Sequence, residues 1–194
     1  MSTKGYQKDF ASFDGKIWLN AASEGPLPLA ADKTLQQAVT WKMKPYLLDM
    51  GKFVTTVTGL KRSIGRLLGV DEADVILGNS ASYGLHLLAN GIPWEKGDEI
   101  LTMQNDFPTN ILPWLALEKK GVIVRQIKPK ERVLEPEELR KFVSARTKLL
   151  CISHVHTFSG YVLDIEGFAQ ICKEKGVVFV LNLSQSLGAM PVNV

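Results

Sequence analysis

Apolar residues recur at helical spacing in the first part of the chain. Two segments show this pattern, and we predict helices over residues 29–43 and 53–68. The first helix should end before Pro45, because a proline disfavours helical geometry in the residue that precedes it. The second should end at Gly69, a typical C-terminal stop. Its apolar face is formed by Leu60, Ile64, Leu67 and Leu68.

From residue 74 onward, short and continuously apolar runs alternate with amphipathic segments. Such runs, bounded by turn residues, are typical of buried strands. We therefore predict strands at residues 74–78, 98–103, 122–127, 148–155 and 177–181. The segments between them predict helices at residues 81–92, 110–121, 135–143 and 164–176. This alternation indicates an α/β fold, with a mostly parallel sheet covered by helices on both faces.

The change of pattern divides the chain into two predicted parts. Residues 1–70 form an N-terminal arm and helices, and residues 71–194 form the α/β domain. The arm, Trp18–Ala30, is rich in Gly, Pro and Ser, which favours extended structure with turns. Ligands of parallel α/β sheets bind at the carboxyl ends of the strands. The loops that follow the strands are therefore the place to look for a site.

Composition and charge exclude several classes of protein. The chain is 45% hydrophobic and 22% charged, as in ordinary globular proteins. No apolar run reaches the roughly 18 residues of a membrane helix, and the N-terminus lacks the apolar core of a signal peptide. The net charge of +3 comes without a dense basic stripe, which argues against nucleic acid as a partner. Cys151 and Cys172 show no disulfide or metal-ligand spacing, so we expect buried, inert thiols in a reducing cytoplasm.

Two loops contain candidate ligand-binding groups ahead of predicted helices. "GNSASYG", residues 78–84, places small polar residues where backbone N–H groups are exposed at a helix start. Such a start can bind an anion, or it can simply be capped by a serine. It matches neither a Walker loop nor a dinucleotide fingerprint. In the second loop, "QNDFPTNILPW", Phe107 could stack on a planar ligand or cover the sheet edge.

Two further loops follow the last two predicted strands. In "SHVHTFSGYVLDI", His154 and His156 are two residues apart in an extended segment, so their side chains should point to opposite sides. A shared metal is not expected, and we predict no metal site. The closing "LNLSQS" places Asn182 and Gln185 just after a buried strand.

The order of these loops resembles the class V aminotransferase group of fold-type I pyridoxal-phosphate enzymes. That group includes cysteine desulfurases, selenocysteine lyases and isopenicillin N epimerase-like proteins. The resemblance extends from about Trp18 to Val194 and is strongest in "WLNAASEGPLP", "GNSASYGLHLLANG", "NDFPTNILPW", "ISHVHTFSGYVLDIEGFAQIC" and "SQSLGAMPVNV". It implies the incomplete large domain of a fold-type I enzyme, with pyridoxal 5'-phosphate as cofactor. It also implies an amino-acid substrate and a cytoplasmic homodimer.

The resemblance implies a cofactor site made of Ala81, Ser82, Phe107, Thr157, Asn182 and Gln185. The first two would offer donors to the phosphate, and the aromatic ring would stack on the cofactor. The threonine and the glutamine would lie near the phenolic oxygen. Asn182 stands where the family has Asp, whose charge keeps a proton on the pyridine nitrogen. A neutral amide can hydrogen-bond but gives little such help, so Asn182 would support binding while weakening carbanion chemistry.

A second departure concerns the lysine that binds the cofactor covalently in this family. It lies beyond the last strand predicted here, and no lysine of the chain matches its place. We therefore assign no catalytic residue.

Three hypotheses remain open at this point. In the leading one, the chain is the N-terminal part of a class V enzyme of the desulfurase, lyase or epimerase type, inactive by itself. The alternative is a non-catalytic descendant that binds a phosphorylated ligand or a partner protein. The third, an unrelated nucleotide-binding domain, is disfavoured because no nucleotide fingerprint is present.

Overall fold

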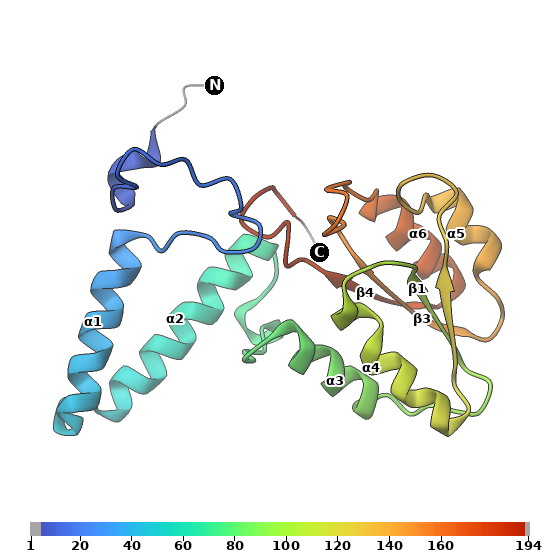
Figure 1. The fold of residues 1–194 in the computed structure, drawn as a ribbon. Helices are drawn as coiled ribbons and strands as arrows, with labels where there is room; N and C mark the ends of the chain where they lie inside the picture. The colour runs from blue at the N-terminus through green and yellow to red at the C-terminus, as the bar shows by residue number, and fades with distance from the viewer. Residues whose placement is uncertain (1–4, 193–194) are drawn as a thin grey trace. The chain divides into compact units, whose positions relative to one another are not determined.

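A computed structural model describes residues 5–192, and the chain divides into two compact units between Ser63 and Ile64. The second unit contains a four-stranded sheet with the order β2-β1-β3-β4, in which all neighbouring strands are parallel (Figure 1). Its strands are β1 (Glu99–Met103), β2 (Ile123–Ile127), β3 (Thr147–Ser153) and β4 (Val178–Asn182). β1 is buried throughout, as expected of a central strand in a parallel sheet. The predicted parallel α/β fold is confirmed.

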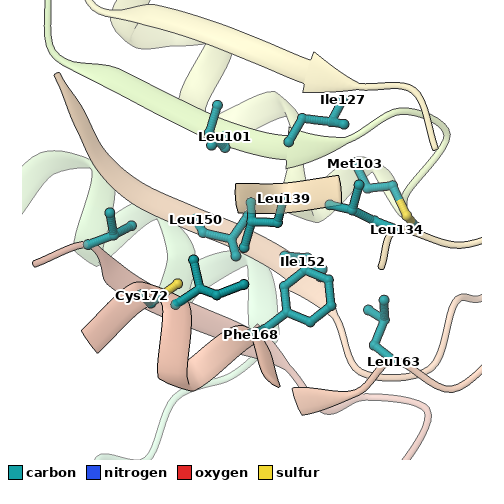
Figure 2. Close-up of a cluster of buried hydrophobic side chains, with 12 residues drawn as sticks. Leu101, Met103, Ile127, Leu134, Leu139, Leu150, Ile152, Leu163, Phe168 and Cys172 are labelled. Carbon is teal, nitrogen blue, oxygen red and sulfur yellow. The ribbon is translucent and has the colours of Figure 1, made fainter. Parts of the chain in front are cut away.

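Side chains that alternate along β1 and β3 build a core on each face of the sheet. On one face, Phe168 and Leu139 pack among strand residues such as Leu150 (Figure 2). They belong to α6 (Ile165–Lys175) and α5 (Pro136–Phe142). Complete burial of such a side chain stabilises the fold by about 1.5–3 kcal/mol. These two helices therefore hold one face of the sheet.

The opposite face of the sheet carries a second core. Ile100 of β1 and Leu149 of β3 pack with Trp114, which is fully buried. The helices on this face are α3 (Ala81–Gly91) and α4 (Leu112–Leu115), followed by a 3-10 turn, Ala116–Lys120. Helices therefore cover both faces, as predicted.

Both cysteines lie inside these cores as free thiols. Burial raises the pKa of Cys151 to about 12 and that of Cys172 to about 11. The nucleophilic thiolate is therefore almost absent near neutral pH. The prediction of two buried thiols is confirmed.

Two predicted elements are wrong. Residues 74–78 form no strand: Glu72–Asp74 is a 3-10 turn, and the extended backbone that follows pairs with no strand among residues 5–192. Val75 is buried but Ile76 is 83% exposed, so burial of Val75 is the main apolar contribution of this segment. A β-strand is stabilised by backbone hydrogen bonds to a neighbouring strand, so an apolar run without such a neighbour does not form one.

The helix predicted at 110–121 is broken into short pieces. A 3-10 turn, Pro108–Asn110, precedes α4, and another turn follows it. Pro113 cannot donate a backbone hydrogen bond and clashes with the turn before it, so a long α-helix cannot begin upstream. Trp114 and Leu117 are both buried, a three-residue spacing that the tighter 3-10 geometry places on one side.

The remaining predicted helices are confirmed with small shifts at their ends. α6 begins where Asp164 Oδ1 accepts a hydrogen bond from Gly167 N at 3.0 Å, and it ends at Gly176 in the left-handed conformation. In the N-terminal part, α1 is Leu29–Met43 and α2 is Met50–Leu68. α2 starts three residues earlier than predicted because Asp49 Oδ1 accepts from Lys52 N at 2.8 Å and caps it. No helix within residues 5–192 is long and apolar enough to span a bilayer.

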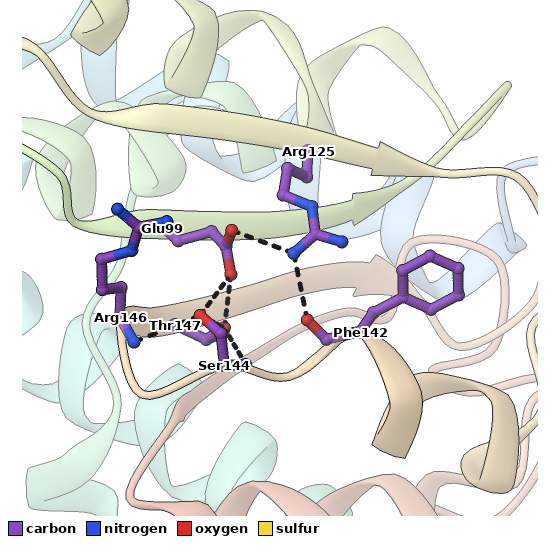
Figure 3. Close-up of polar contacts among 6 residues, drawn as sticks. All are labelled: Glu99, Arg125, Phe142, Ser144, Arg146 and Thr147. Carbon is purple, nitrogen blue, oxygen red and sulfur yellow. Dashed lines mark hydrogen bonds and ion pairs between the residues drawn. The ribbon is translucent and has the colours of Figure 1, made fainter.

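An ionic cluster around the buried Glu99 lies at the amino ends of the strands (Figure 3). Glu99, 3% exposed, accepts hydrogen bonds from Arg125 Nη1 at 2.9 Å, Ser144 Oγ at 2.9 Å and Thr147 Oγ1 at 2.7 Å. Desolvation of Glu99 raises its pKa, but these bonds outweigh it, so the pKa lies below its usual range. This cluster joins β1, β2 and β3 at the edge opposite the carboxyl ends, so we regard it as structural.

Candidate functional site

A pocket of about 220 Å³ lies at the carboxyl ends of β1, β3 and β4. It is lined by Ala81, Phe107, Thr109, Ser153, Thr157, Asn182, Ser184 and Gln185. Five of the six residues predicted for a cofactor site are therefore brought together from four separate loops. The location is the one at which parallel α/β sheets bind their ligands.

The sixth residue, Ser82, supports the pocket without lining it. Its Oγ is hydrogen-bonded to Thr109 Oγ1 at 2.9 Å, and Thr109 is part of the wall. Thr109, Ser153 and Ser184 were not predicted. Each lies in or next to a loop at a strand end, which is the signal that could have identified them.

The start of α3 leaves donors available at the pocket. Ser80 Oγ accepts from Tyr83 N at 3.1 Å and caps one of the first-turn N–H groups. Within residues 5–192, nothing accepts a hydrogen bond from the N–H groups of Ala81 and Ser82. Free N–H groups and the positive end of the helix dipole favour an anion. The serine cap and the anion site, posed as alternatives by the sequence, are thus compatible.

Phe107 is carried by a loop that is held in place from below. It is 43% exposed at the pocket, and its N–H donates to Asp106 Oδ1 at 2.7 Å. Just before it, Asn105 has a φ of 61°, a left-handed conformation that Asn tolerates better than most residues. The aromatic ring is therefore presented to the pocket by a tightly turned segment.

His156 joins the Phe107 loop to the Thr157 loop. Its Nε2 lies 2.8 Å from Asn105 O and its Nδ1 lies 2.7 Å from Ser159 Oγ. A carbonyl oxygen only accepts, so Nε2 carries a proton and donates it to Asn105 O. The imidazole thus acts as a clip between two loops that line the pocket. Among residues 5–192, no group of three or more His, Cys, Asp or Glu side chains could hold a metal.

His154 takes no part in the pocket. It is 4% exposed, and its Nδ1 has no hydrogen-bond partner within residues 5–192. Burial lowers the pKa of His154, so the neutral form is favoured. The two histidines therefore lie in different environments.

The chemistry of the pocket fits a flat, anionic, heteroaromatic group. Free helix N–H groups suit a phosphate, Phe107 suits a ring face, and the Asn182 amide suits a ring heteroatom. No lysine is among the residues that line it. The pocket can therefore bind and orient such a group, while its walls offer no amine for covalent attachment.

Sequence comparison identifies a matching family model and several related proteins. The family model "Aminotransferase class-V" matches residues 45–194. A probable cysteine desulfurase of Methanothermobacter thermautotrophicus is 25% identical over the whole chain and half of its own length. Cysteine desulfurase IscS of Buchnera aphidicola is 28% identical over 69% of the chain and 34% of its own length. The chain thus spans half or less of the length of these curated relatives.

Solved structures show the same fold. A mutant of C-DES with glycine covalently linked to its PLP cofactor has a TM-score of 0.87 at 19% identity, covering 96% of this chain and 51% of that one. Apo cysteine desulfurase from Thermococcus onnurineus has a TM-score of 0.80 at 23% identity, covering 96% of this chain and 48% of that one. The family model matches residues 45–194, which is well over half of the chain. The chain therefore belongs to the aminotransferase class-V family.

Proposed function

We propose that the chain is the N-terminal part of a pyridoxal-phosphate enzyme of the cysteine desulfurase type, acting on an amino acid. The observation that carries the proposal is the pocket, which gathers Ala81, Phe107, Thr157, Asn182 and Gln185 at the strand ends. Pyridoxal phosphate, when bound, supplies an electron sink for bonds at the substrate α-carbon. The chain's own residues bind and orient it.

Each part of the pocket has one role in this proposal. The free N–H groups at the start of α3, together with Ser82, bind the phosphate. Phe107 stacks on the ring, and Thr157 and Gln185 lie near the phenolic oxygen. Asn182 hydrogen-bonds the ring nitrogen. Because no lysine lines the pocket, binding is non-covalent and weak, and the isolated chain is inactive.

The proposal extends to assembly and location. The protein is a homodimer, because α1 buries no side chain and the apolar side chains of the first unit need a surface to pack on. It resides in the cytoplasm, a reducing compartment in which two buried free thiols persist.

Two observations favour a second candidate, a non-catalytic descendant that binds a phosphorylated ligand or a partner protein. Asn182 cannot supply the charge that the family's Asp gives, and the pocket walls contain no lysine. Both functions predict phosphate binding at α3. Only the leading one requires selectivity for the pyridoxal ring.

Fluorescence titration of the chain with pyridoxal phosphate tests the leading function. We expect saturable binding that Phe107→Ala weakens at least about fivefold, since ring stacking contributes about 1 kcal/mol beyond burial. Phe53→Ala is the control, because Phe53 is 52% exposed on α2 and lies outside the pocket. Inorganic phosphate that competes as strongly as pyridoxal phosphate would favour the second candidate. Equal effects of both variants would contradict the assigned site.

A further inference from the structure

Polar side chains from the carboxyl ends of three strands form a continuous network beneath the pocket. They are Asp106 and Asn110 after β1, Ser153 at the end of β3 and Asn182 at the end of β4. Asp106 is 3% exposed and Asn110 is fully buried. Buried polar groups of this kind are costly unless every member is satisfied, so their bonding directions are tightly constrained.

The Asp106 carboxylate is surrounded entirely by donors. Oδ1 accepts from Phe107 N and Ser153 Oγ, both at 2.7 Å. Oδ2 accepts from Ser153 N at 2.9 Å and from Asn110 Nδ2 at 3.0 Å. No salt bridge involves Asp106 within residues 5–192. This charge is therefore held by hydrogen bonds alone, and an ionised carboxylate can only accept them.

The Asp106 carboxylate determines which way the Asn110 amide faces. Asn110 must turn its Nδ2 toward that acceptor, and the same Nδ2 also donates to Ser153 Oγ at 2.8 Å. Both protons of this amide are then used, and only its Oδ1 is left for a further bond. That oxygen accepts from Asn182 Nδ2 at 2.8 Å.

The far end of the network fixes the same orientation independently. Asn182 Oδ1 accepts from Ser184 N at 2.9 Å, and a backbone N–H can only donate. The oxygen and nitrogen of an amide are distinguished by their partners. Here an obligatory acceptor at one end and an obligatory donor at the other give the same answer. The Asn182 amide therefore has a single orientation.

We propose that Asp106 and Asn110 are positioning residues that lock the Asn182 amide, so that the pocket recognises an unprotonated ring nitrogen. One N–H of Asn182 Nδ2 is used by Asn110, and the other remains for a ligand. A neutral pyridine nitrogen accepts such a bond, whereas a protonated one has no lone pair for it. This inference rests on the proposed function for the identity of the ring.

The same network makes a carboxylate at position 182 incompatible with its neighbours. Asn182→Asp would set an oxygen against Asn110 Oδ1, where a 2.8 Å hydrogen bond now exists. If Asn110 turned its amide over, its oxygen would instead face Asp106. Changing Asp106→Ala as well relieves this conflict. With the carboxylate gone, Asn110 can turn its amide over, donate toward position 182 and accept from Ser153 Oγ, which now donates to Asp106. The family's acidic residue is therefore disfavoured here as a single change.

A double-mutant cycle in urea tests the lock without any cofactor. We expect Asn182→Asp to raise the unfolding equilibrium constant at least about tenfold, the usual effect of an unmatched buried polar group. In the Asp106→Ala background, the same change should raise it several-fold less, since contacting residues in one network couple. Asn20→Asp, an exposed change of the same chemistry, should have little effect. Strictly additive effects of the two network changes would overturn the lock.

Recognition of an unprotonated ring nitrogen is tested separately, by ¹⁵N NMR of pyridoxal phosphate labelled at that nitrogen. We expect a pyridine-type signal for the complex at neutral pH, and a pyridinium-type signal with the Asp106→Ala, Asn182→Asp double variant. A pyridinium-type signal with the unmodified chain would refute recognition of an unprotonated nitrogen, while the proposed function would stand. Absence of any bound signal would refute both this recognition and the proposed function. The mutant cycle would still decide whether Asp106 and Asn110 fix the orientation of the Asn182 amide.

Discussion

At the scale of single residues, the pocket follows from polar groups that have only one way to bond. Asp106 can only accept and Ser184 N can only donate, and the amides between them have no freedom left. Asn182 is thus more than a neutral replacement of an acidic residue, because its amide bonds to both Asn110 and Ser184. Its neutral amide is the form that its buried neighbours require.

His154 provides a prediction at this scale. Burial lowers its folded-state pKa below the unfolded value of about 6.5, so the unfolded chain binds more protons as the pH falls. The stabilising effect of the neutral form is therefore complete above about pH 6.5 and is lost below it. We expect His154→Leu to flatten the dependence of the unfolding free energy on pH between pH 7.5 and 5.5, as measured by urea denaturation.

The matched control for this measurement is His86→Leu, because His86 is exposed on α3. This variant should keep the slope of the unmodified chain. If His154→Leu keeps the full slope as well, burial of His154 is not its cause.

The sequence predicted the residues that line the pocket better than it predicted the hydrogen-bonded network of Asp106 and Asn110 that supports them. Phe107, Thr157 and Gln185 could be placed because they follow strands in a recognisable order. Asp106 and Asn110 look like ordinary loop residues in "QNDFPTN", a segment typical of turns. Their importance depends on contacts with Ser153, more than forty residues away, which no local pattern contains.

At the scale of elements, the predictions succeeded where burial and local preference agreed. The four strands of the sheet are apolar runs that pair with one another. Helix α6 has an apolar face, the Asp164 cap at its start and Gly176 at its end, and all three features indicate the same helix. The predictions failed at residues 74–78, where an apolar run pairs with no strand within residues 5–192. They also failed at residues 110–121, where the short α4 lies between two 3-10 turns. A strand depends on its neighbour, and that information is not local.

Two glycines of the second unit give a paired prediction about helices. Gly176 ends α6 with a φ of 68°, so Gly176→Ala should lower the unfolding free energy by about 1 kcal/mol. Gly84 lies inside α3 with open space around it, so Gly84→Ala should raise that free energy by about 0.5–1 kcal/mol. Urea denaturation measures both. Effects of the same sign in the two variants would show that backbone conformation does not determine the outcome.

At the scale of the whole molecule, the first unit has no buried residue within its described part, residues 5–63. α1 buries no side chain, and α2 leaves Val57 and Leu60 about half exposed. The arm contributes further exposed residues, among them Leu19, which is 88% exposed. Since apolar area favours burial by about 25 cal/mol per Å², such a unit is expected to find a partner surface.

We therefore predict that the chain self-associates. Sedimentation velocity should show a sedimentation coefficient that rises with protein concentration, and deletion of residues 1–28 should reduce this rise. A sharp monomer peak at every concentration, unchanged by the deletion, would contradict the prediction. That outcome would mean that the arm packs on its own chain.

The central claim is that the pocket at the strand ends binds pyridoxal phosphate without a covalent bond. A crystal structure of the chain with this cofactor tests it most directly. We predict the phosphate at the N–H groups of Ala81 and Ser82, the ring against Phe107, and its nitrogen at Asn182. An empty pocket at saturating cofactor, or cofactor attached to a lysine elsewhere on the chain, would contradict the account.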